Sequence, residues 1–254
     1  YVTQLSRATS SVKVFDANGM MITEFSDPGI VSGREIALDL NNNVLYVASN
    51  SDSTIHVYDD PYNLSGVVSA NRVMSLNGEP WGISYDAAGD RLFVAKDKTS
   101  AFQVYNNPSS LDGMTMPSNE IAIMGATRTH GITYSSILDV LVVTEIGAAS
   151  GGTFNEDGGY YLFAGVSTSI AMGATTIAPT RSVIGLNTQM GNPVDVAIDD
   201  RDGGNYIYIA EKTNGGSLLI FDAAANGDVA PDLFVRYPAI PEALFLDTSG
   251  PILP

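Results

Sequence analysis

Short apolar runs of the kind found in β-strands recur along the chain and are separated by polar turns. Two such runs, joined by a turn rich in Asn, Gly and Asp, recur four times with the same residue pattern. The first run ends in Asp or Ser, and the second is rich in β-branched and aromatic residues. The four pairs are REIALD with VLYVAS (34–49), WGISYD with RLFVAK (81–96), HGITYS with VLVVTE (130–145) and VDVAID with YIYIAE (194–211).

A third and a weaker fourth strand follow each pair, so the repeat predicts units of four antiparallel strands. The third strands are TIHVYD (54–59), AFQVYN (101–106), YYLFAG (160–165) and LLIFDA (218–223). Apolar residues occupy both faces of these runs, which is the pattern of sheets that are covered on both sides. Helical periodicity is nearly absent, and no linker divides the chain, so we predict one all-β domain over 1–254.

The spacing of the repeat predicts how many units there are. The residues that end the first strands, Asp39, Asp86, Ser135, Asp199 and Asp247, are 47, 49, 64 and 48 residues apart. A fifth first strand, EALFLD at 242–247, lacks its partners before the chain ends, and YVTQL, SVKVFD and MMITEF in residues 1–25 supply them. We therefore predict a five-bladed β-propeller whose last blade is closed by strands from both chain ends. The expected blades are 34–76, 81–124, 130–185, 194–236, and 242–254 together with 1–25; a count of six would require a blade within 146–180.

Composition limits the function. The formal net charge is −16, which disfavours binding to nucleic-acid phosphates and to anionic membranes. No apolar run approaches the roughly 18–20 residues that span a bilayer. The chain has no cysteine and two histidines, so disulfides, thiolate sites and multi-histidine metal sites are excluded. We expect no cofactor, and calcium is kept as an alternative for two acidic loops described below.

The chain resembles the NHL and YVTN families of β-propeller repeats. The resemblance rests on LYVA followed by VYD in the first repeat, on GNPVDVAID at 191–199, on YIYIAEKTNGGSLLIFDAAANGDVAP at 206–231 and on YVTQLSRATSSVKVFD at 1–16. It implies a propeller fold and a secreted or surface-exposed protein. It transfers no catalytic motif residue by residue.

Two rings of unlike residues are predicted at one mouth of the propeller channel, where first strands begin and second strands end. Equivalent positions of a purely structural repeat should look alike, and these do not. The ring at the first strands holds Arg34, Trp81, His130, Val194 and Glu242, followed by Glu35, Gly82, Gly131, Asp195 and Ala243; the ring at the second strands holds Gln4, Ser49, Lys96, Glu145 and Glu211.

These rings give the candidate site. The ligand-binding candidates are Gln4, Arg34, Glu35, Trp81, Lys96, His130, Asp195 and Glu242. Trp81, the only tryptophan, could stack on a sugar ring, and Arg34 and Lys96 could bind an anion. His130 is predicted near Glu145, and this pair and Glu211 are the catalytic candidates. The alternative is a wet mouth whose charged residues only pair with one another.

Two loops carry weaker signals. The segment 146–159, IGAASGGTFNEDGG, is longer than in the other repeats, and it is interpreted as a lid carrying Phe154 or as a neutral insertion. NEDGG at 155–159 and DDRDGGN at 199–205 resemble calcium loops but lack the EF-hand glutamate at position twelve, so tight turns are predicted there. His56, in a third strand, is predicted to be a packed or surface residue.

Two functions remain open at this stage. The favoured one is a monomeric, extracellular, cell-surface or periplasmic module that binds a small ligand, a glycan or a protein at the mouth. The sequence starts at Tyr1 without a signal peptide, so we expect a processed form. The alternative is a carboxylate-dependent hydrolase or lyase, in which two mouth carboxylates stand about 6.5–9.5 Å apart as in inverting glycosidases.

Overall fold

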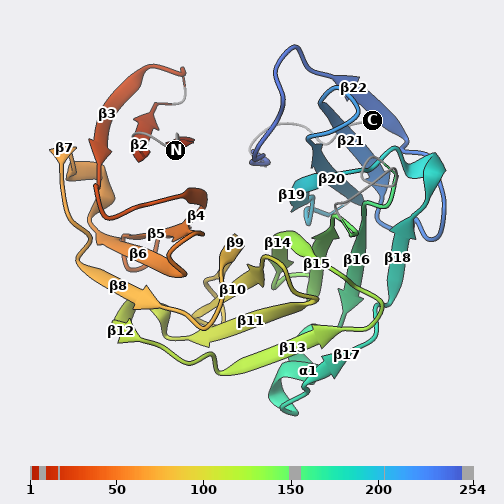
Figure 1. The fold of residues 1–254 in the computed structure, drawn as a ribbon, viewed down its shortest axis with the longest axis horizontal. Helices are drawn as coiled ribbons and strands as arrows, with labels where there is room; N and C mark the ends of the chain where they lie inside the picture. Colours follow the sequence, from red (N-terminus) through yellow and green to blue (C-terminus); the bar gives the residue numbers. More distant parts are fainter. Residues whose placement is uncertain (1, 6–9, 17, 149–155, 203, 248–254) are drawn as a thin grey trace. The chain divides into compact units, whose positions relative to one another are not determined.

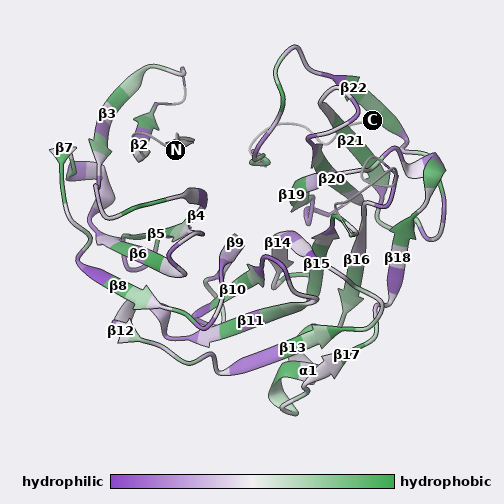
Figure 2. Ribbon diagram, in the orientation of Figure 1, coloured by the Kyte–Doolittle hydropathy of each residue, from purple (hydrophilic) through white to green (hydrophobic). Residues whose placement is uncertain are grey.

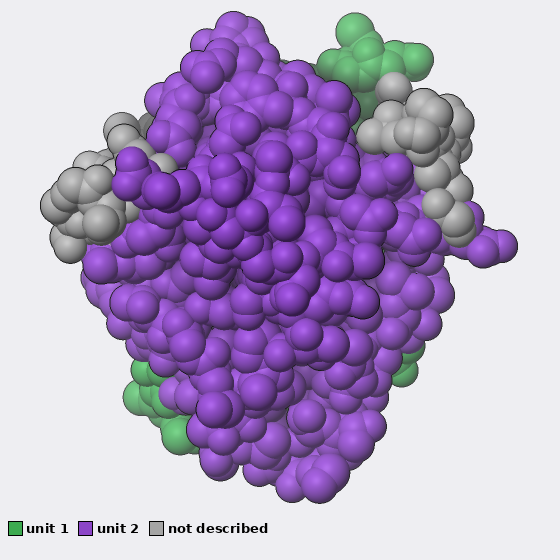
Figure 3. Space-filling model, turned by 90° about the vertical axis from the view of Figure 1, so that its right-hand side faces the viewer, with its two compact units in different colours: residues 1–97, 104–118 green, residues 98–103, 119–254 purple. Residues whose placement is uncertain are grey.

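The structure is a computed structural model of the 254-residue chain, and it describes all residues except 1, 6–9, 17, 149–155, 203 and 248–254. The described chain, drawn as a ribbon in Figure 1, falls into two compact units, which Figure 3 shows in different colours. Unit 1 comprises residues 1–97 and 104–118, and unit 2 comprises residues 98–103 and 119–254. Each unit is described by itself below, and the single domain expected over 1–254 stays a prediction.

Unit 1 contains two complete sheets and a hairpin. The first sheet has the order β1-β2-β3-β7 and the second β12-β8-β6-β5-β4. The strands are β1 (Val2–Leu5), β2 (Ser10–Phe15), β3 (Met21–Ser26), β4 (Gly33–Asp39), β5 (Val44–Ser49), β6 (Thr54–Asp59), β7 (Gly66–Val67), β8 (Arg72–Ser75) and β12 (Gly113–Met114), and the hairpin is β9 (Pro80–Asp86) with β10 (Arg91–Lys96).

Unit 2 also contains two complete sheets, with the orders β14-β15-β16-β18 and β19-β20-β21-β22. Strand β11 (Ala101–Asn106) has residues in both units. The remaining elements are β13 (Asn119–Ile123), β14 (Thr129–Ser135), β15 (Val140–Glu145), β16 (Gly159–Ala164), α1 (Val166–Ala171), β17 (Thr176–Ile177), β18 (Arg181–Ile184), β19 (Pro193–Ile198), β20 (Tyr206–Glu211), β21 (Ser217–Asp222) and β22 (Leu233–Arg236). No helix in the described part of the chain is long and apolar enough to span a membrane.

The strands of the described residues group into five sheets, and the fold is an all-β five-bladed β-propeller. Blade 1 is built on β4, β5, β6 and β8, blade 2 on β9, β10, β11 and β13, blade 3 on β14, β15, β16 and β18, and blade 4 on β19 to β22; β1 to β3 form the N-terminal blade. The stretch 146–180 holds β16, α1 and β17 rather than a blade of its own, so the count of five is confirmed. The short helix α1 was not predicted.

Hydrophobic residues recur along the strands (Figure 2), and many of them are buried in the core. Strand β5 is buried along its whole length. Its residues Leu45 and Val47 pack with Val12 and Phe25 of the N-terminal blade. Residues of the opposite face of β5, such as Tyr46, belong to a second cluster with residues of blade 2. Each inner strand thus buries both faces, as the sequence pattern predicts.

Each first strand ends in a polar residue because that side chain caps the following turn. Asp39 accepts hydrogen bonds from the backbone N–H groups of Asn41 and Asn42. Asp86 accepts one from Ala88, and Asp199 accepts one from Arg201. The repeated Asp is therefore a turn residue, and it explains the regular spacing seen in the sequence.

Blades with more than four strands were not predicted. Three two-residue strands, β7, β12 and β17, pair in parallel with the outer strands β3, β8 and β13. They add a strand to the outer edge of a sheet and cover backbone groups that would otherwise be open to other chains. The run of two residues is too short to give a strand signal in the sequence.

The strand predicted over 242–247 is wrong, because residues 238–247 form no strand. This segment has no ladder partner among the described residues and is mostly exposed; Phe245 is 90% exposed. One contact holds it in register with the repeat: the Leu244 backbone N–H donates to Oδ2 of Asp195, at 2.7 Å. The predicted closure of the last blade by the two chain ends is not shown, since β1 to β3 pair with β7 and residues 248–254 lie outside the described part.

Candidate functional site

The predicted alignment of the two rings is confirmed within blades 1 to 4. The last residue of each second strand lies opposite the residue that begins the first strand of the same blade. The four pairs are Ser49 with Gly33, Lys96 with Pro80, Glu145 with Thr129, and Glu211 with Pro193. The first-ring residues Arg34, Trp81, His130 and Val194 follow directly.

Each of these first strands has a register shift at the ring. The shift falls between Gly33 and Ile36 in β4, between Thr129 and Ile132 in β14, and between Pro193 and Asp195 in β19. In blade 2, Val94 and Lys96 of β10 pair with Ile83 and Pro80 of β9, so Trp81 and Gly82 lie opposite the single residue Ala95. Bulges turn side chains away from the regular alternation and are frequent beside binding sites. No feature of the amino-acid pattern predicts these bulges.

The catalytic candidate Glu145 is used to hold the backbone of its own blade. Its carboxylate is 3% exposed and accepts hydrogen bonds from the N–H groups of Thr127, Arg128 and Gly147, at 2.8–3.1 Å. Burial raises the pKa of Glu145, and these three donors oppose that effect. A carboxylate so occupied clamps the loop before the first strand.

Glu211 makes the same clamp in blade 4. Its carboxylate is fully buried and accepts bonds from the N–H groups of Gly191 and Asn192 and from both the N–H and the hydroxyl of Thr213. Burial raises the pKa of Glu211 against these donors. In blade 1 the hydroxyl oxygen of Ser49 takes the corresponding bonds, from Val31 and Ser32.

The predicted pairing of His130 with Glu145 stays a prediction. His130 is 2% exposed and lies in β14 at the position that the repeat predicts. The Glu145 oxygens face backbone donors. The position of the histidine in the repeat was predicted correctly, but the direction of the carboxylate was set by the loop.

Two further ring carboxylates bind the backbone of the following repeat. Oε2 of Glu35 accepts a hydrogen bond from the Ile83 N–H at 3.0 Å. Asp195 accepts one from the equivalent residue, Leu244. Glu242 forms an ion pair with Lys212. These three ligand-binding candidates therefore have partners within their own units.

Arg34 and Trp81 form the most distinctive pair of the ring. The guanidinium carbon of Arg34 lies 4.2 Å from the centre of the Trp81 ring, a cation–π contact. Both side chains are half-buried and both sit at bulged positions of first strands in unit 1. Lys96 pairs with Pro80, the residue that precedes Trp81, and is 7% exposed.

The remaining sequence candidates lie partly outside the described residues. Strand β1 places Gln4 opposite Ser11, but the Gln4 side chain is outside the description. Phe154 of the proposed lid also lies outside it. Hydrogen bonds hold both ends of the 146–159 loop: the Gly147 N–H donates to Glu145, and the Ala148 N–H donates to Asp157.

The two loops that resemble calcium sites have other partners. Asp199 is buried and forms an ion pair with Arg201 at 2.6 Å, which together with hydrogen bonding lowers the pKa of Asp199. In the second loop, Asp157 accepts from Ala148. Within the described ranges no group of three or more acidic or histidine side chains gathers as a metal site would require.

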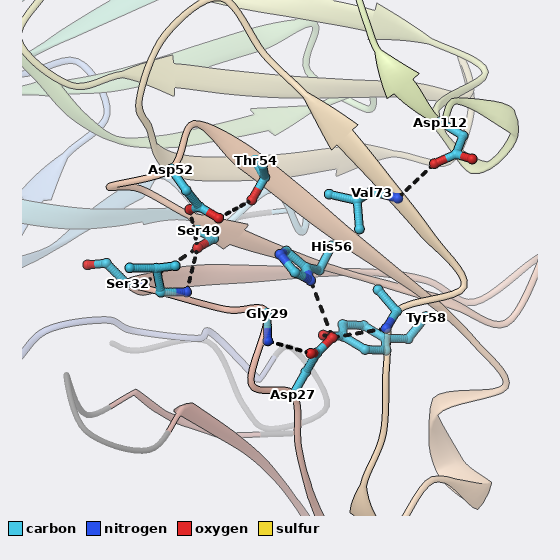
Figure 4. A network of polar contacts seen from close by, with 12 residues as sticks. Asp27, Gly29, Ser32, Ser49, Asp52, Thr54, His56, Tyr58, Val73 and Asp112 are labelled. Atoms are coloured by element: carbon cyan, nitrogen blue, oxygen red, sulfur yellow. Dashed lines mark hydrogen bonds and ion pairs between the residues drawn. The ribbon is translucent and has the colours of Figure 1, made fainter.

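A buried polar network in unit 1 was missed by the sequence analysis (Figure 4). Asp27, 6% exposed, accepts hydrogen bonds from Tyr58 Oη at 2.8 Å and from the N–H groups of Gly29 and Ala70, and its Oδ2 lies 3.3 Å from Nδ1 of His56. Burial opposes ionisation of Asp27, but the donors and His56 together lower its pKa. The packed interpretation of His56 is confirmed. Asp27 precedes a Pro-Gly turn, where an exposed carboxylate is the ordinary expectation.

Comparison with known proteins identifies the fold alone. No protein-family model matches the chain, and no curated protein matches it either. Among solved structures, a functionally unknown protein from Desulfotomaculum acetoxidans aligns over 98% of this chain and 69% of its own at 11% identity, with a TM-score of 0.62. The hydrazine synthase of Kuenenia stuttgartiensis aligns over 84% and 56% at 16% identity, with a TM-score of 0.58. The Dos1 propeller aligns over 91% and 56% at 10% identity, with a TM-score of 0.52.

These likenesses support a β-propeller and no particular activity. The chain spans about 56% of the length of the first two structures it resembles, the synthase and the Dos1 propeller. Equivalent folds carry unrelated functions, so function must be argued from the ring residues.

Proposed function

We propose that this chain is a binding module, extracellular or at a cell surface, that holds its ligand on Arg34 and Trp81. The observation that carries the proposal is the guanidinium of Arg34 stacked 4.2 Å over Trp81 on the bulged strand ends. An indole face of this kind suits the apolar face of a sugar ring, and the guanidinium offers donors beside it. Propellers commonly serve as binding modules, which favours the same function.

The ring carboxylates support binding over hydrolysis. A glycosidase needs one carboxyl to protonate the leaving group and a second to act on water or on the sugar. Glu145 and Glu211 accept hydrogen bonds from backbone donors of their own loops, and Glu35 and Asp195 each accept one from the backbone of the following repeat. The hydrolase or lyase therefore remains only an alternative outcome of the test.

Removing the guanidinium should weaken ligand binding. Because the chain has a single tryptophan, fluorescence excited at wavelengths that tyrosine does not absorb reports on Trp81 alone. A glycan array with the whole chain would select ligands, and each would then be titrated against Trp81 fluorescence. Arg34→Ala is expected to weaken binding tenfold or more, about 1.4 kcal/mol.

Lys13→Ala is the matched control, since Lys13 is a half-exposed cation in β2, 3.9 Å from Glu24. It should leave the affinity unchanged. Equal affinity in the Arg34→Ala variant would contradict the proposal, and turnover of a bound glycan would favour the hydrolase.

We also propose that residues 242–254 and 1–25 complete a fifth blade, as the repeat spacing predicts. The bond from Leu244 N–H to Asp195 repeats the bond from Ile83 N–H to Glu35, so residues 242–247 follow the register of a first strand. By that register Leu244 should face Val2 as Ile36 faces Val47.

A disulfide tests this closure, because the chain has no cysteine of its own. The double variant Val2→Cys with Leu244→Cys should form an intramolecular disulfide in more than half of the molecules, measured by mass spectrometry without reductant. Val2→Cys with Phe245→Cys, one residue out of register, is the control. Equal yields from both pairs would argue against the closure.

A further inference from the structure

Loops of the chain cover the outer edges of the sheets, and each comes from between the third and fourth strands of the following blade. We call these loops straps; they comprise residues 60–71, 107–118, 165–180 and 223–232. The first three contain β7, β12 and β17, which pair in parallel with β3, β8 and β13. The fourth reaches β18, where the Gly227 N–H donates to the Ser182 carbonyl at 2.7 Å. Every sheet that is followed by another blade in the chain therefore has a strap.

Two straps hold the second residue of the strand they cover in the same way. The backbone N–H of that residue donates to an Asp or Asn side chain of the strap. The bonds run from Val73 to Asp112 (Figure 4) and from Ser182 to Asn226, at 2.9 and 3.1 Å. A glycine follows the acceptor in both straps, and its φ is positive, +69° at Gly113 and +82° at Gly227. An Asp-Gly or Asn-Gly pair is thus the part of the strap that recognises the strand edge.

The strap backbone bonds the fourth residue of the covered strand. In blade 1 the fourth residue of β8, Ser75, accepts at its carbonyl from the Thr115 N–H, at 2.9 Å. In blade 2 the fourth residue of β13, Ala122, donates its N–H to the Thr175 carbonyl, also at 2.9 Å. The N–H and C=O groups of this position therefore point away from the sheet, toward the strap.

Strand β22 has the same register but ends its sheet without a strap. Its fourth residue is Arg236. The residue after the fourth position bonds the third strand in three blades, from Leu76 to Ser53, from Ile123 to Ser100 and from Tyr237 to Gly216, at 2.8–3.3 Å. Since inward and outward groups alternate along a strand, the Arg236 N–H and C=O point outward like those of Ser75 and Ala122. In the part of unit 2 that the structure describes, no residue bonds these two groups.

The order of the repeat gives a reason for the missing strap. A strap for β22 would be the loop between the third and fourth strands of the next blade. In the fifth blade proposed above, that loop lies between β2 and β3 and comprises residues 16–20. It closes on itself: the Asp16 N–H donates to the Met20 carbonyl and the Gly19 N–H to the Asp16 carbonyl, at 2.9 and 3.0 Å. So short a turn has no residues left to lie along a neighbouring sheet. This reason rests on the proposed closure, whereas the edge position of β22 does not.

We propose that the outer edge of β22 binds an extended segment of a partner protein, which joins the sheet of blade 4 as a short parallel strand in the place of a strap. The segment has the chemistry of the straps. An Asp or Asn side chain accepts from the N–H of Phe234, the second residue of β22, a glycine follows, and a later N–H donates to the Arg236 carbonyl. A second copy of this chain is a poorer donor, because its four straps already cover its own sheets.

A peptide copied from a strap tests the proposal. The probe is SSLDGMTMP, residues 109–117 of this chain, with blocked ends. It is titrated against the isotope-labelled whole chain, and amide hydrogen exchange is followed by NMR. At saturating peptide, exchange of the Arg236 amide should slow at least fivefold. The Val73 amide, already bonded to Asp112, should not change. A peptide with Thr115→Pro lacks the N–H for the Arg236 carbonyl and should bind at least tenfold more weakly.

Two variants of the whole chain provide the matched comparison. Arg236→Pro removes the outward N–H, and proline is tolerated on edge strands, whereas Arg236→Ala removes the side chain only. The proline variant should bind the peptide at least tenfold more weakly than wild type, and the alanine variant within twofold of it. Circular dichroism verifies that both are folded.

The contrary outcomes are distinct from failure of the glycan site or of the blade closure. Absence of peptide binding by wild type, or equal binding by the two variants, would overturn the inference and leave both earlier proposals standing. An Arg236 amide that exchanges slowly without peptide would overturn it as well, because the chain would then cover its own edge. A wild-type dimer that Arg236→Pro converts to a monomer would overturn the partner in favour of a second copy.

Discussion

Replacing Glu211 with alanine is expected to destabilise the protein by about 3 kcal/mol or more, since each buried donor left without a partner costs about 1–3 kcal/mol. The variant would leave the N–H groups of Gly191, Asn192 and Thr213 without their acceptor in a fully buried place. Urea denaturation followed by circular dichroism measures the change. Glu24→Ala, an exposed glutamate in β3, is the control and should change stability by less than about 0.5 kcal/mol.

The pH dependence gives the same prediction a second readout. Burial raises the pKa of Glu211, so the folded state holds this proton more tightly than the unfolded state. Its contribution to stability is then complete below the unfolded pKa and is lost as pH rises through the folded pKa. The stability advantage of wild type over Glu211→Gln should therefore widen as pH falls from about 7 toward about 5. A gap that narrows over this range would contradict the burial of Glu211.

The second large effect is expected at Gly131, where two first strands of unit 2 approach closely. A Cβ on Gly131 would lie 2.6 Å from Cα of Asp195 and 3.0 Å from its carbonyl carbon, and backbone atoms cannot rotate away. Strands β14 and β19 would have to separate. Gly131→Ala is expected to cost about 3 kcal/mol, at the upper end of the usual range for overpacking.

Gly165→Ala is the control that distinguishes a steric clash with the neighbouring backbone from the strain of a positive φ. Gly165 has a φ of +70° with open space around its Cα, so alanine there should cost about 1 kcal/mol. Thermal unfolding of both variants measures the difference. Similar losses at the two glycines would mean that β14 and β19 do not touch at Gly131.

For the carboxylates of the ring, the sequence predicts their positions but not their hydrogen-bond partners. Their alignment at the strand ends was predictable, because period-two patterning and turn spacing fix which residue ends each strand. Their chemistry was not, because it depends on where backbone N–H groups of the preceding loop point. Glu145 and Glu211 were catalytic candidates in the sequence and are loop clamps in the structure.

Contacts between residues far apart in the chain could also not be predicted from the sequence. Asp27 and His56 meet across 29 residues, and neither carries a local signal for the other. The stacking of Arg34 on Trp81 joins two blades, although both residues were selected individually. Residues 242–247 have the pattern of a strand, yet a strand also needs a hydrogen-bonding partner, which this pattern cannot supply.

The sequence by itself determined the all-β class, the five repeats, the strand order within them and the ring positions, because these follow from side-chain periodicity and turn residues that act over a few neighbours. Only the tertiary structure decided which ring side chains hold the backbone of the fold, because hydrogen bonding of buried polar groups depends on donors brought together from distant segments.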